Sequence, residues 1–165
     1  MASATEAPWH AAFPKPKAQA EFISREDTLA LFSSAKPGKD FILVDVRRTD
    51  FEFDDKEMLN IQGGTIKNSV NFPAHSFYHI REAVYDLVKA AGVKTVISYC
   101  GSSNGRGPRV AGWLQDTINE KGDDSIKSVA MTGGIKGWAK AGEEYTSQMV
   151  GYEKEAWETK PDGCA

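Results

Sequence analysis

Two short, nearly continuous apolar runs, at residues 41–46 and 95–99, constrain the fold of this chain more than any other feature. Both runs are rich in β-branched residues and too short for amphipathic helices. Such runs are typical of strands that are buried on both faces, which occur in sheets covered by helices on both sides. The two runs therefore predict central strands of an α/β fold.

Helical patterns alternate with short β-rich segments along the rest of the chain. Further strands are predicted at residues 21–23, 66–72 and 127–131. Helices are predicted at residues 25–34, 77–91, 110–118 and 135–141. This alternation predicts a central, mostly parallel β-sheet flanked by helices on both faces.

Several residues mark where these elements begin and end. Ser24 followed by Asp27 resembles a capping box and predicts the start of a helix. Pro37 and Gly38 end that helix, and Gly92 ends the one before the 95–99 strand. The polar, acidic stretch over residues 48–65 is predicted to be a long loop.

The length of 165 residues predicts one domain with short flanking segments. Residues 1–20 hold three prolines and are expected to form a flexible N-terminal arm. The compact domain is expected over residues 21–142, followed by a charged, loosely held C-terminal tail over residues 143–165.

Composition and charge exclude several classes of function. Hydrophobic residues make up 41% and charged residues 26% of the chain, and the net charge is −3. The chain has no basic run of the kind that binds nucleic acid, so no nucleic-acid partner is expected. No apolar stretch approaches the roughly 18 residues that span a bilayer, and residues 1–20 lack the apolar core of a signal peptide. A location in the cytoplasm, extending to the nucleus, is expected, with no membrane partner.

The chain has only two cysteines, Cys100 and Cys164, which are too few for a disulfide scaffold. Its three histidines have no zinc-finger spacing, and although His75 and His79 are four residues apart on a helix, no third ligand is evident. No metal site is therefore expected. Cys164 is expected to be an idle surface thiol; the alternative is a resolving thiol that swings toward an oxidised or arsenylated Cys100.

The segment from Cys100 to Arg106 carries the most specific chemical signal. Cys100 follows a predicted buried strand, and Arg106 stands where the next helix begins, so both lie at the carboxyl edge of the sheet, where ligands bind. The intervening residues are small or polar: Gly101, Ser102, Ser103, Asn104 and Gly105.

Each residue type in this loop suits the binding of an oxyanion. A helix N-terminus and an arginine near Cys100 favour its thiolate, which is the nucleophilic form. Gly101 and Gly105 leave backbone N–H groups free to converge on an anion, and the planar fork of Arg106 matches two of its oxygens. Ser102 and Ser103 add hydroxyl donors, either to the anion or to the departing sulfur. The alternative is a buried core cysteine followed by an incidental surface arginine.

The spacing of Cys100 and Arg106 resembles the C-x5-R signature of cysteine phosphatases and some arsenate reductases. Three other segments are similar to motifs of the rhodanese superfamily: D-V-R at residues 45–47, a glycine-to-proline element at 64–73, and G-G-x-x-x-W at 133–138. The chain departs from that family's pattern at Tyr99, where histidine is usual, and at Thr65 and Asn68, where histidine and glycine are usual.

This resemblance implies a rhodanese-like catalytic domain over residues 21–142. The loop is one residue longer than in sulfurtransferases, and Ser103 and the Arg106-Gly-Pro run resemble the single-domain dual-specificity phosphatases and the fungal and plant arsenate reductases. A phosphatase with a phosphocysteine on Cys100, acting on a phosphorylated substrate without cofactor, is the first expectation.

Three alternatives remain open at this point. The second expectation is arsenate reduction on the same loop, with arsenate as a small oxyanion and glutathione or glutaredoxin as reductant. A thiosulfate-type sulfurtransferase and a silent anion-binding or protein-docking module are less favoured, because of the loop length and the intact Cys100–Arg106 pair respectively.

Other residues are candidates for supporting roles. Asp45 and Arg47 are expected to fix backbone groups at a strand end, with a substrate-side role as the alternative. Arg109 is expected either to attract an anionic substrate or to be solvated, and Trp113 and Trp138 are expected in the core. The acid that protonates the leaving oxygen is sought among four carboxylates of the polar loop: Asp50, Asp54, Asp55 and Glu57.

Overall fold

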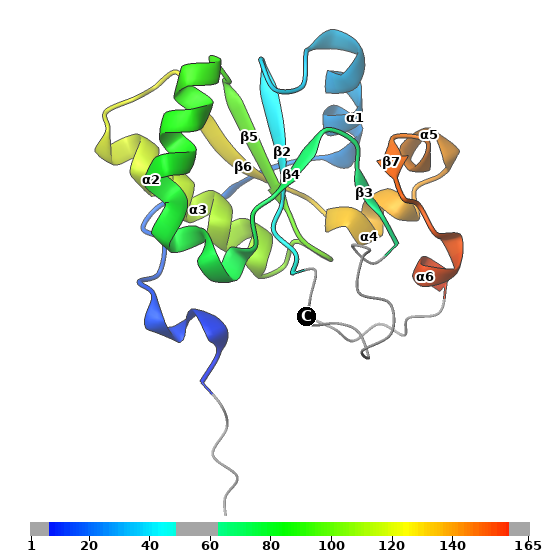
Figure 1. Ribbon diagram of the computed structural model, residues 1–165, viewed down its shortest axis with the longest axis horizontal. Helices are drawn as coiled ribbons and strands as arrows, with labels where there is room; N and C mark the ends of the chain where they lie inside the picture. Colours follow the sequence, from blue (N-terminus) through cyan, green and yellow to red (C-terminus); the bar gives the residue numbers. More distant parts are fainter. Residues whose placement is uncertain (1–6, 49–62, 159–165) are drawn as a thin grey trace, which may run out of the picture.

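Five parallel strands form the central sheet, in the spatial order β1-β6-β5-β2-β4 (Figure 1). The computed structural model describes residues 7–48 and 63–158. The strands of the sheet are β1 (Glu21–Ile23), β2 (Phe41–Asp45), β4 (Ser69–Asn71), β5 (Thr95–Tyr99) and β6 (Lys127–Met131). Because all five strands run in one direction, their carboxyl ends meet at one edge, where ligands bind in sheets of this type. The predicted mostly parallel sheet is confirmed.

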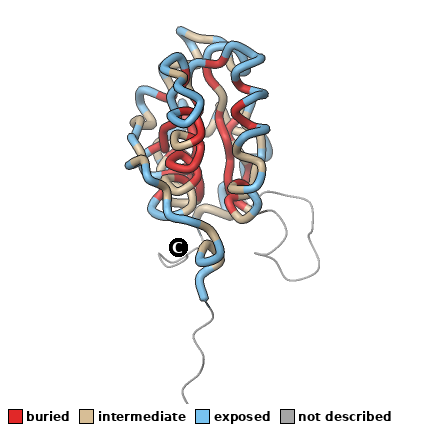
Figure 2. Tube along the Cα trace, turned by 90° about the vertical axis from the view of Figure 1, so that its left-hand side faces the viewer, coloured by how far each residue is buried: buried red, intermediate tan, exposed pale blue. Residues whose placement is uncertain are grey.

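Helices cover both faces of this sheet (Figure 1). One face carries α2 (Ala74–Ala91) and α3 (Arg106–Glu120), and the other carries α1 (Arg25–Ser34), α4 (Gly134–Ala139) and α5 (Glu143–Thr146). Figure 2 shows the buried residues along the strands and on the sides of the helices that face them. The prediction of helices on both faces is confirmed.

Two hydrophobic cores follow from the alternation of side chains along the strands. Val96 of β5 packs in the core beneath α2 and α3, which also contains Cys100 and Trp113. Its neighbour Ile97 packs in the core beneath α1 and α4, which also contains Trp138. Both tryptophans are buried, as the sequence predicted.

The predicted helix boundaries have the expected capping contacts. The Oγ of Ser24 accepts a hydrogen bond of 3.0 Å from the backbone N–H of Asp27, and α1 begins at the next residue after Ser24. Gly92 ends α2 in the left-handed conformation, with a φ of 75°.

The single strand predicted over residues 66–72 differs in the structure, where it is two strands of different sheets. Asn68 adopts a φ of 62°, which breaks the extended chain between β3 (Thr65–Ile66) and β4. β4 joins the central sheet, whereas β3 pairs antiparallel with β7 (Met149–Val150). Asparagine tolerates this left-handed backbone better than most residues, which explains why it can stand where glycine is usual.

The segment before β1, predicted to be a flexible arm, contacts the domain over residues 9–18. It contains a 3-10 helix, η1 (Trp9–Ala12), and the Trp9 ring lies 4.4 Å from the ring of His75 on α2. The Asp116 carboxylate on α3 accepts hydrogen bonds of 2.7 Å from the backbone N–H groups of Lys17 and Ala18. These aromatic and polar contacts hold this part of the segment against α2 and α3.

The C-terminal tail, predicted to be loosely held, also packs on the domain through residue 158. Tyr145 is buried, and its carbonyl accepts a 2.8 Å hydrogen bond from the Trp138 indole. β7 pairs with β3, and Trp157 of α6 (Lys154–Glu158) donates a 2.9 Å hydrogen bond to the carbonyl of Gly63. Apolar residues that stand among the charged residues of the tail, such as Tyr145 and Trp157, explain these contacts.

Within residues 7–48 and 63–158, no helix is long and apolar enough to span a membrane.

Candidate active site

Cys100 lies directly after β5, at the carboxyl edge of the sheet, with only 3% of its surface exposed. The backbone N–H groups of Ser103 and Gly107 donate to its Sγ over 3.2 and 3.4 Å. The loop thus curls around the sulfur before it enters α3. Two amide donors directed at one sulfur atom stabilise negative charge there.

The backbone of α4 holds the first part of the loop. The N–H groups of Ile135 and Lys136 donate to the carbonyls of Cys100 and Gly101 over 3.0 and 2.9 Å. Gly134 has a φ of 58°, and a Cβ atom there would lie 2.5 Å from both carbonyl oxygens. Only glycine permits this approach, which is the physical reason for the second glycine of the G-G-x-x-x-W motif.

Arg106 is half-buried at the first turn of α3, and its guanidinium lies over the loop. Its Nη2 is 3.9 Å from the position that a Cβ of Gly101 would occupy. Within the described ranges, the Arg106 side chain has no hydrogen bond or ion pair, and the amides of Gly101, Ser102, Asn104 and Gly105 donate to no protein acceptor.

This arrangement has the groups that could receive an oxyanion above the Cys100 sulfur. The loop offers free backbone donors, Arg106 offers a planar cation, and the dipole of α3 adds positive charge at the same place. An anion of tetrahedral shape in the loop would present its central atom to Sγ. Covalent catalysis by Cys100 stays a prediction from the sequence, with which this geometry is compatible.

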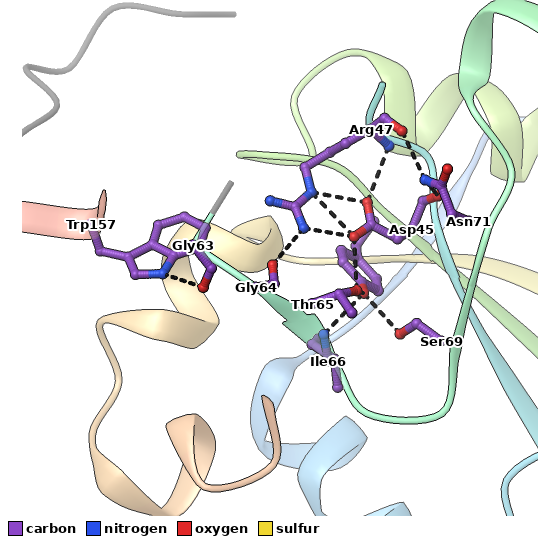
Figure 3. A network of polar contacts seen from close by, with 10 residues as sticks. Asp45, Arg47, Gly63, Gly64, Thr65, Ile66, Ser69, Asn71 and Trp157 are labelled. Atoms are coloured by element: carbon purple, nitrogen blue, oxygen red, sulfur yellow. Dashed lines mark hydrogen bonds and ion pairs between the residues drawn. The ribbon is translucent and has the colours of Figure 1, made fainter. Parts of the chain in front are cut away.

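Asp45, the last residue of β2, and Arg47, which follows this strand, form a buried ion pair (Figure 3). The Arg47 Nη2 lies 2.7 Å from the Asp45 Oδ2 and also donates to the Gly64 carbonyl over 2.8 Å. Asn71 donates from its amide to the carbonyls of both Asp45 and Arg47. These contacts tie β2, β3 and β4 together, which is the backbone-fixing role expected for the pair.

Tyr99 extends this network from the strand that carries Cys100. Its hydroxyl lies 2.9 Å from the Oγ1 of Thr65 and 2.8 Å from the Oγ of Ser69, and it accepts from the backbone N–H of Ile66. The Thr65 hydroxyl donates to Asp45, so Tyr99 must donate to Thr65 and accept from Ser69. Burial raises the pKa of Tyr99 well above its usual value, and the negative charge of Asp45 adds to the rise.

Comparison with protein families decides the identity of the domain. Residues 27–141 match the model of the rhodanese-like domain. The chain belongs to the rhodanese-like family. Comparison of the sequence with curated proteins gives no match.

Solved structures show the same rhodanese-like fold at low sequence identity. Two structures of Ygr203w from the yeast Saccharomyces cerevisiae align with a TM-score of 0.64. One is described as a protein tyrosine phosphatase of the rhodanese family, with 19% identity over 85% of this chain and 98% of that chain. The other, at 20% identity, covers 85% of this chain and 93% of that chain. An As-Sb reductase from Leishmania major aligns with a TM-score of 0.48 and 18% identity, over 70% and 72% of the two chains.

The remaining basic and histidine candidates of the rhodanese-like domain have aromatic partners. The Arg109 guanidinium lies 5.9 Å from the centre of the Trp113 ring. His75 and His79, predicted on an ordinary helix surface, contact the rings of Trp9 and Phe13 respectively. Across residues 7–48 and 63–158, no three His, Cys, Asp or Glu side chains are grouped so as to hold a metal ion.

Some predicted site residues lie outside the described residues of the rhodanese-like domain and its flanks. These are the four candidate acids, Asp50, Asp54, Asp55 and Glu57, and the second cysteine, Cys164.

The contacts of Gly107 and Trp157 are not among those that the sequence predicts. Gly107 donates to the sulfur through its backbone, which a side-chain motif does not reveal. Trp157 lies beyond the matched residues 27–141, and its ring occupies the space that a Cβ of Gly63 would need. A large aromatic in a charged tail was the available signal for this second contact.

Proposed function

We propose that this protein is a cysteine-dependent phosphatase of the protein tyrosine or dual-specificity type. The observation that carries the proposal is the set of unpaired donors around Cys100. The free loop amides and the unpaired Arg106 guanidinium, within the described part of the chain, match the equatorial oxygens of a phosphoryl group. The name of the yeast structure with the same fold, a protein tyrosine phosphatase, agrees with this choice.

The first step transfers the phosphoryl group to sulfur. The Cys100 thiolate attacks phosphorus, an S–P bond forms, and the bond from phosphorus to the leaving oxygen breaks. The leaving oxygen takes the electron pair and then a proton. Arg106 and the loop amides hold the three equatorial oxygens during the transfer. These donors stabilise the negative charge that the three oxygens carry in the transition state.

The second step releases phosphate. Water attacks the phosphorus of the phosphocysteine, the S–P bond breaks, and its electron pair returns to the sulfur. The same donors that held the oxygens in the first step hold them here, so one loop serves both steps. The two steps draw on the thiolate, the loop, Arg106 and water, and the acid sought among Asp50, Asp54, Asp55 and Glu57 supplies the proton that the leaving oxygen takes.

The test is hydrolysis of 4-nitrophenyl phosphate by the purified protein, with Cys100→Ser as the matched control. We expect turnover in the natural protein and a loss of at least about 10³-fold in the variant, because serine is a far weaker nucleophile at neutral pH. Circular dichroism of both proteins confirms that the variant is folded.

Absence of turnover in both proteins would overturn the phosphatase proposal. Assays with arsenate plus glutathione and glutaredoxin, and with thiosulfate plus cyanide, then identify which alternative chemistry the loop supports. A loss of activity in either of those assays on replacing Cys100 would assign that reaction to the same loop.

A further inference from the structure

The first two peptide groups of the loop after Cys100 are hydrogen-bonded to the backbone of α4. The Cys100 carbonyl accepts from the N–H of Ile135 over 3.0 Å, and the Gly101 carbonyl accepts from the N–H of Lys136 over 2.9 Å. α4 covers one face of the sheet, whereas the Cys100 side chain packs on the other face, beneath α2 and α3 (Figure 1). Both carbonyls therefore point away from the side of the loop that carries the sulfur.

The direction of these two carbonyls fixes the direction of two amides. In a trans peptide group the C=O and the N–H point in opposite directions, and the described residues contain no cis peptide bond. The Cys100 carbonyl shares its peptide group with the N–H of Gly101, and the Gly101 carbonyl shares its group with the N–H of Ser102. These two N–H groups therefore point away from α4, toward the side of the loop where the sulfur lies.

The backbone donors of the loop fall into two groups. The N–H groups of Gly101 and Ser102 have no acceptor within residues 7–48 and 63–158, so they are available to a ligand. The N–H groups of Ser103 and Gly107 instead donate to the sulfur of Cys100, over 3.2 and 3.4 Å. α4 thus sets the direction of free donors, and the donors to the sulfur come from later peptide groups.

Gly134, the first residue of α4, makes this contact possible. A Cβ atom there would lie 2.5 Å from the carbonyl oxygens of both Cys100 and Gly101, so a side chain would force both peptide groups to turn. The preceding Gly133 has a φ of 77°, close to the 58° of Gly134, but a Cβ there would meet only the Cα of Gly137, at 3.7 Å. The two glycines share a left-handed backbone and differ in their contact with the loop.

Contacts at its other end hold α4 in place. The indole of Trp138, a fully buried residue, donates to the Tyr145 carbonyl over 2.8 Å. The guanidinium of Arg25 on α1 donates to the Gly137 carbonyl over 3.1 Å. Because closely packed and hydrogen-bonded elements resist small displacements, α4 can hold the loop carbonyls in one orientation.

We propose that Gly134 is a positioning residue for anion binding, because it lets the amides of α4 orient the N–H groups of Gly101 and Ser102 toward an oxyanion. The inference rests on the proposed phosphatase function, but it concerns the binding of the anion and not the chemistry on sulfur. Its ligand class is the tetrahedral oxyanions, whose several oxygens can accept from both amides and from Arg106 together. Donors that are already oriented need no rearrangement when the anion arrives, which strengthens binding.

The test measures the binding of tungstate, a tetrahedral oxyanion without an ester bond, by titration calorimetry. We expect Gly134→Ala to bind tungstate about 10- to 100-fold more weakly than the natural protein, because two hydrogen bonds to the anion lose their geometry. Gly133→Ala is the matched control, since alanine adopts the same unfavourable left-handed backbone there without reaching the loop. Its affinity should stay within about 3-fold of the natural value.

Alkylation of Cys100 separates the loss of anion binding from general damage to the loop. Iodoacetamide is uncharged, so its reaction with the thiolate does not depend on the anion donors. The alkylation rate in Gly134→Ala should stay within about 3-fold of the natural value, because the sulfur takes its hydrogen bonds from Ser103 and Gly107. Peptide mass mapping distinguishes Cys100 from Cys164, and urea unfolding reports whether each alanine variant is folded.

Amide NMR tests the same point in the natural protein, so an answer follows even if Gly134→Ala does not fold. On addition of tungstate, the amide proton signals of Gly101 and Ser102 should move downfield, because both N–H groups then donate to the anion. The signals of Ile135 and Lys136 should move much less, since their N–H groups stay bonded to the loop carbonyls.

Three results would overturn the inference. They are an unchanged tungstate affinity in a folded Gly134→Ala variant, an equal loss of affinity in Gly133→Ala, and no response of the Gly101 and Ser102 signals in the natural protein. A fall of the alkylation rate as large as the fall in affinity would also contradict it. If the natural protein binds tungstate with these NMR shifts but hydrolyses no phosphate ester, the proposed function fails and the inference stands.

Discussion

Two polar regions lie at the same edge of the sheet, and they differ in how far their groups are paired. In the network around Asp45, the side chains of Arg47 and Thr65 are paired with its carboxylate (Figure 3). The contacts continue from Thr65 to the hydroxyl of Tyr99. In the loop after Cys100, the Ser103 hydroxyl, the Arg106 guanidinium and four backbone amides have no partner within the described residues; the amides are those of Gly101, Ser102, Asn104 and Gly105.

This difference separates a structural role from a chemical one more clearly than residue type does. Both regions contain an arginine and hydroxyl groups near a strand end, so their composition alone does not distinguish them. A fully paired buried network rigidifies the fold and leaves nothing for a ligand. An unpaired set of donors keeps its binding capacity for a molecule that is not part of the chain.

The largest expected effect is that of Arg106→Ala on activity. The variant should lose about 10³-fold or more in kcat/KM for 4-nitrophenyl phosphate, because the transferring phosphoryl group loses its cationic partner. Its free energy of unfolding should stay within about 0.5 kcal/mol of the natural value, since the side chain makes no ion pair in the described structure. Steady-state kinetics and urea unfolding measure the two quantities. A large loss of stability would contradict the contrast between the unpaired loop and the paired network around Asp45.

Asp45→Asn should have the opposite profile to Arg106→Ala, with its main effect on stability. Replacing Asp45 leaves the buried Arg47 without its counter-charge, which typically costs about 3–5 kcal/mol of unfolding free energy. Glu21→Gln is the matched control, because Glu21 pairs with Lys127 on the exposed surface and should cost less than about 1 kcal/mol. Equal effects of the two variants in urea unfolding would contradict the buried network as a structural unit.

Tyr99→Phe sharpens the comparison on the strand that leads to Cys100. The variant loses the hydroxyl that Ser69 and Thr65 contact, and it should be less stable by about 1–3 kcal/mol at pH 7. Its activity should change by less than about 3-fold, because the hydroxyl lies on the opposite face of the strand from the sulfur.

The difference in unfolding free energy between the natural protein and Tyr99→Phe depends on pH. The folded protein holds the pKa of Tyr99 above its usual value of about 10, so the neutral hydroxyl contributes stability fully below that pH. As pH rises past about 10, the unfolded chain ionises first and this contribution is lost. The stability difference between the natural protein and Tyr99→Phe should therefore shrink from pH 8 to about pH 11; a constant difference would contradict it.

The smallest expected effect is that of Trp157→Phe, which removes one hydrogen bond and keeps an aromatic ring. The loss of the indole N–H to the Gly63 carbonyl should lower the unfolding free energy by about 1 kcal/mol. Gly63 adjoins Gly64, which accepts from Arg47, so the contact belongs to the paired region. A loss of activity greater than about 3-fold without a change in stability would place Trp157 with the loop instead.

Much of the fold could be predicted from the sequence because its signals are local. The apolar runs at 41–46 and 95–99, the Ser24 cap and the Gly92 stop all act within a few residues, and each appears in the structure. The division of the chain at Asn68 could not be predicted this way, because β3 takes its partner from β7, far along the sequence. The packed flanking segments likewise depend on contacts with α2, α3 and Gly63.

The same distinction between local and long-range signals applies to the candidate site. Cys100 and Arg106 can be singled out from the sequence because the proposed chemistry needs those side chains at that spacing. The sulfur contact of Gly107 and the carbonyl contacts of α4 are made by backbone groups, which any residue type supplies, so the sequence signals them only through glycines that leave room. The place of Tyr99 follows from a three-dimensional network that spans β2, β3 and β4.

The pairing of β1 with β6 has a consequence for how the chain is made. Glu21 pairs with Val129, which is synthesised later than Glu21 and after most of the domain. The first strand must therefore wait, unpaired, while the inner strands assemble. Its length of three residues limits the risk of wrong pairing during that delay, since a short strand offers few backbone groups to another chain. The sheet can be completed only when β6 has emerged.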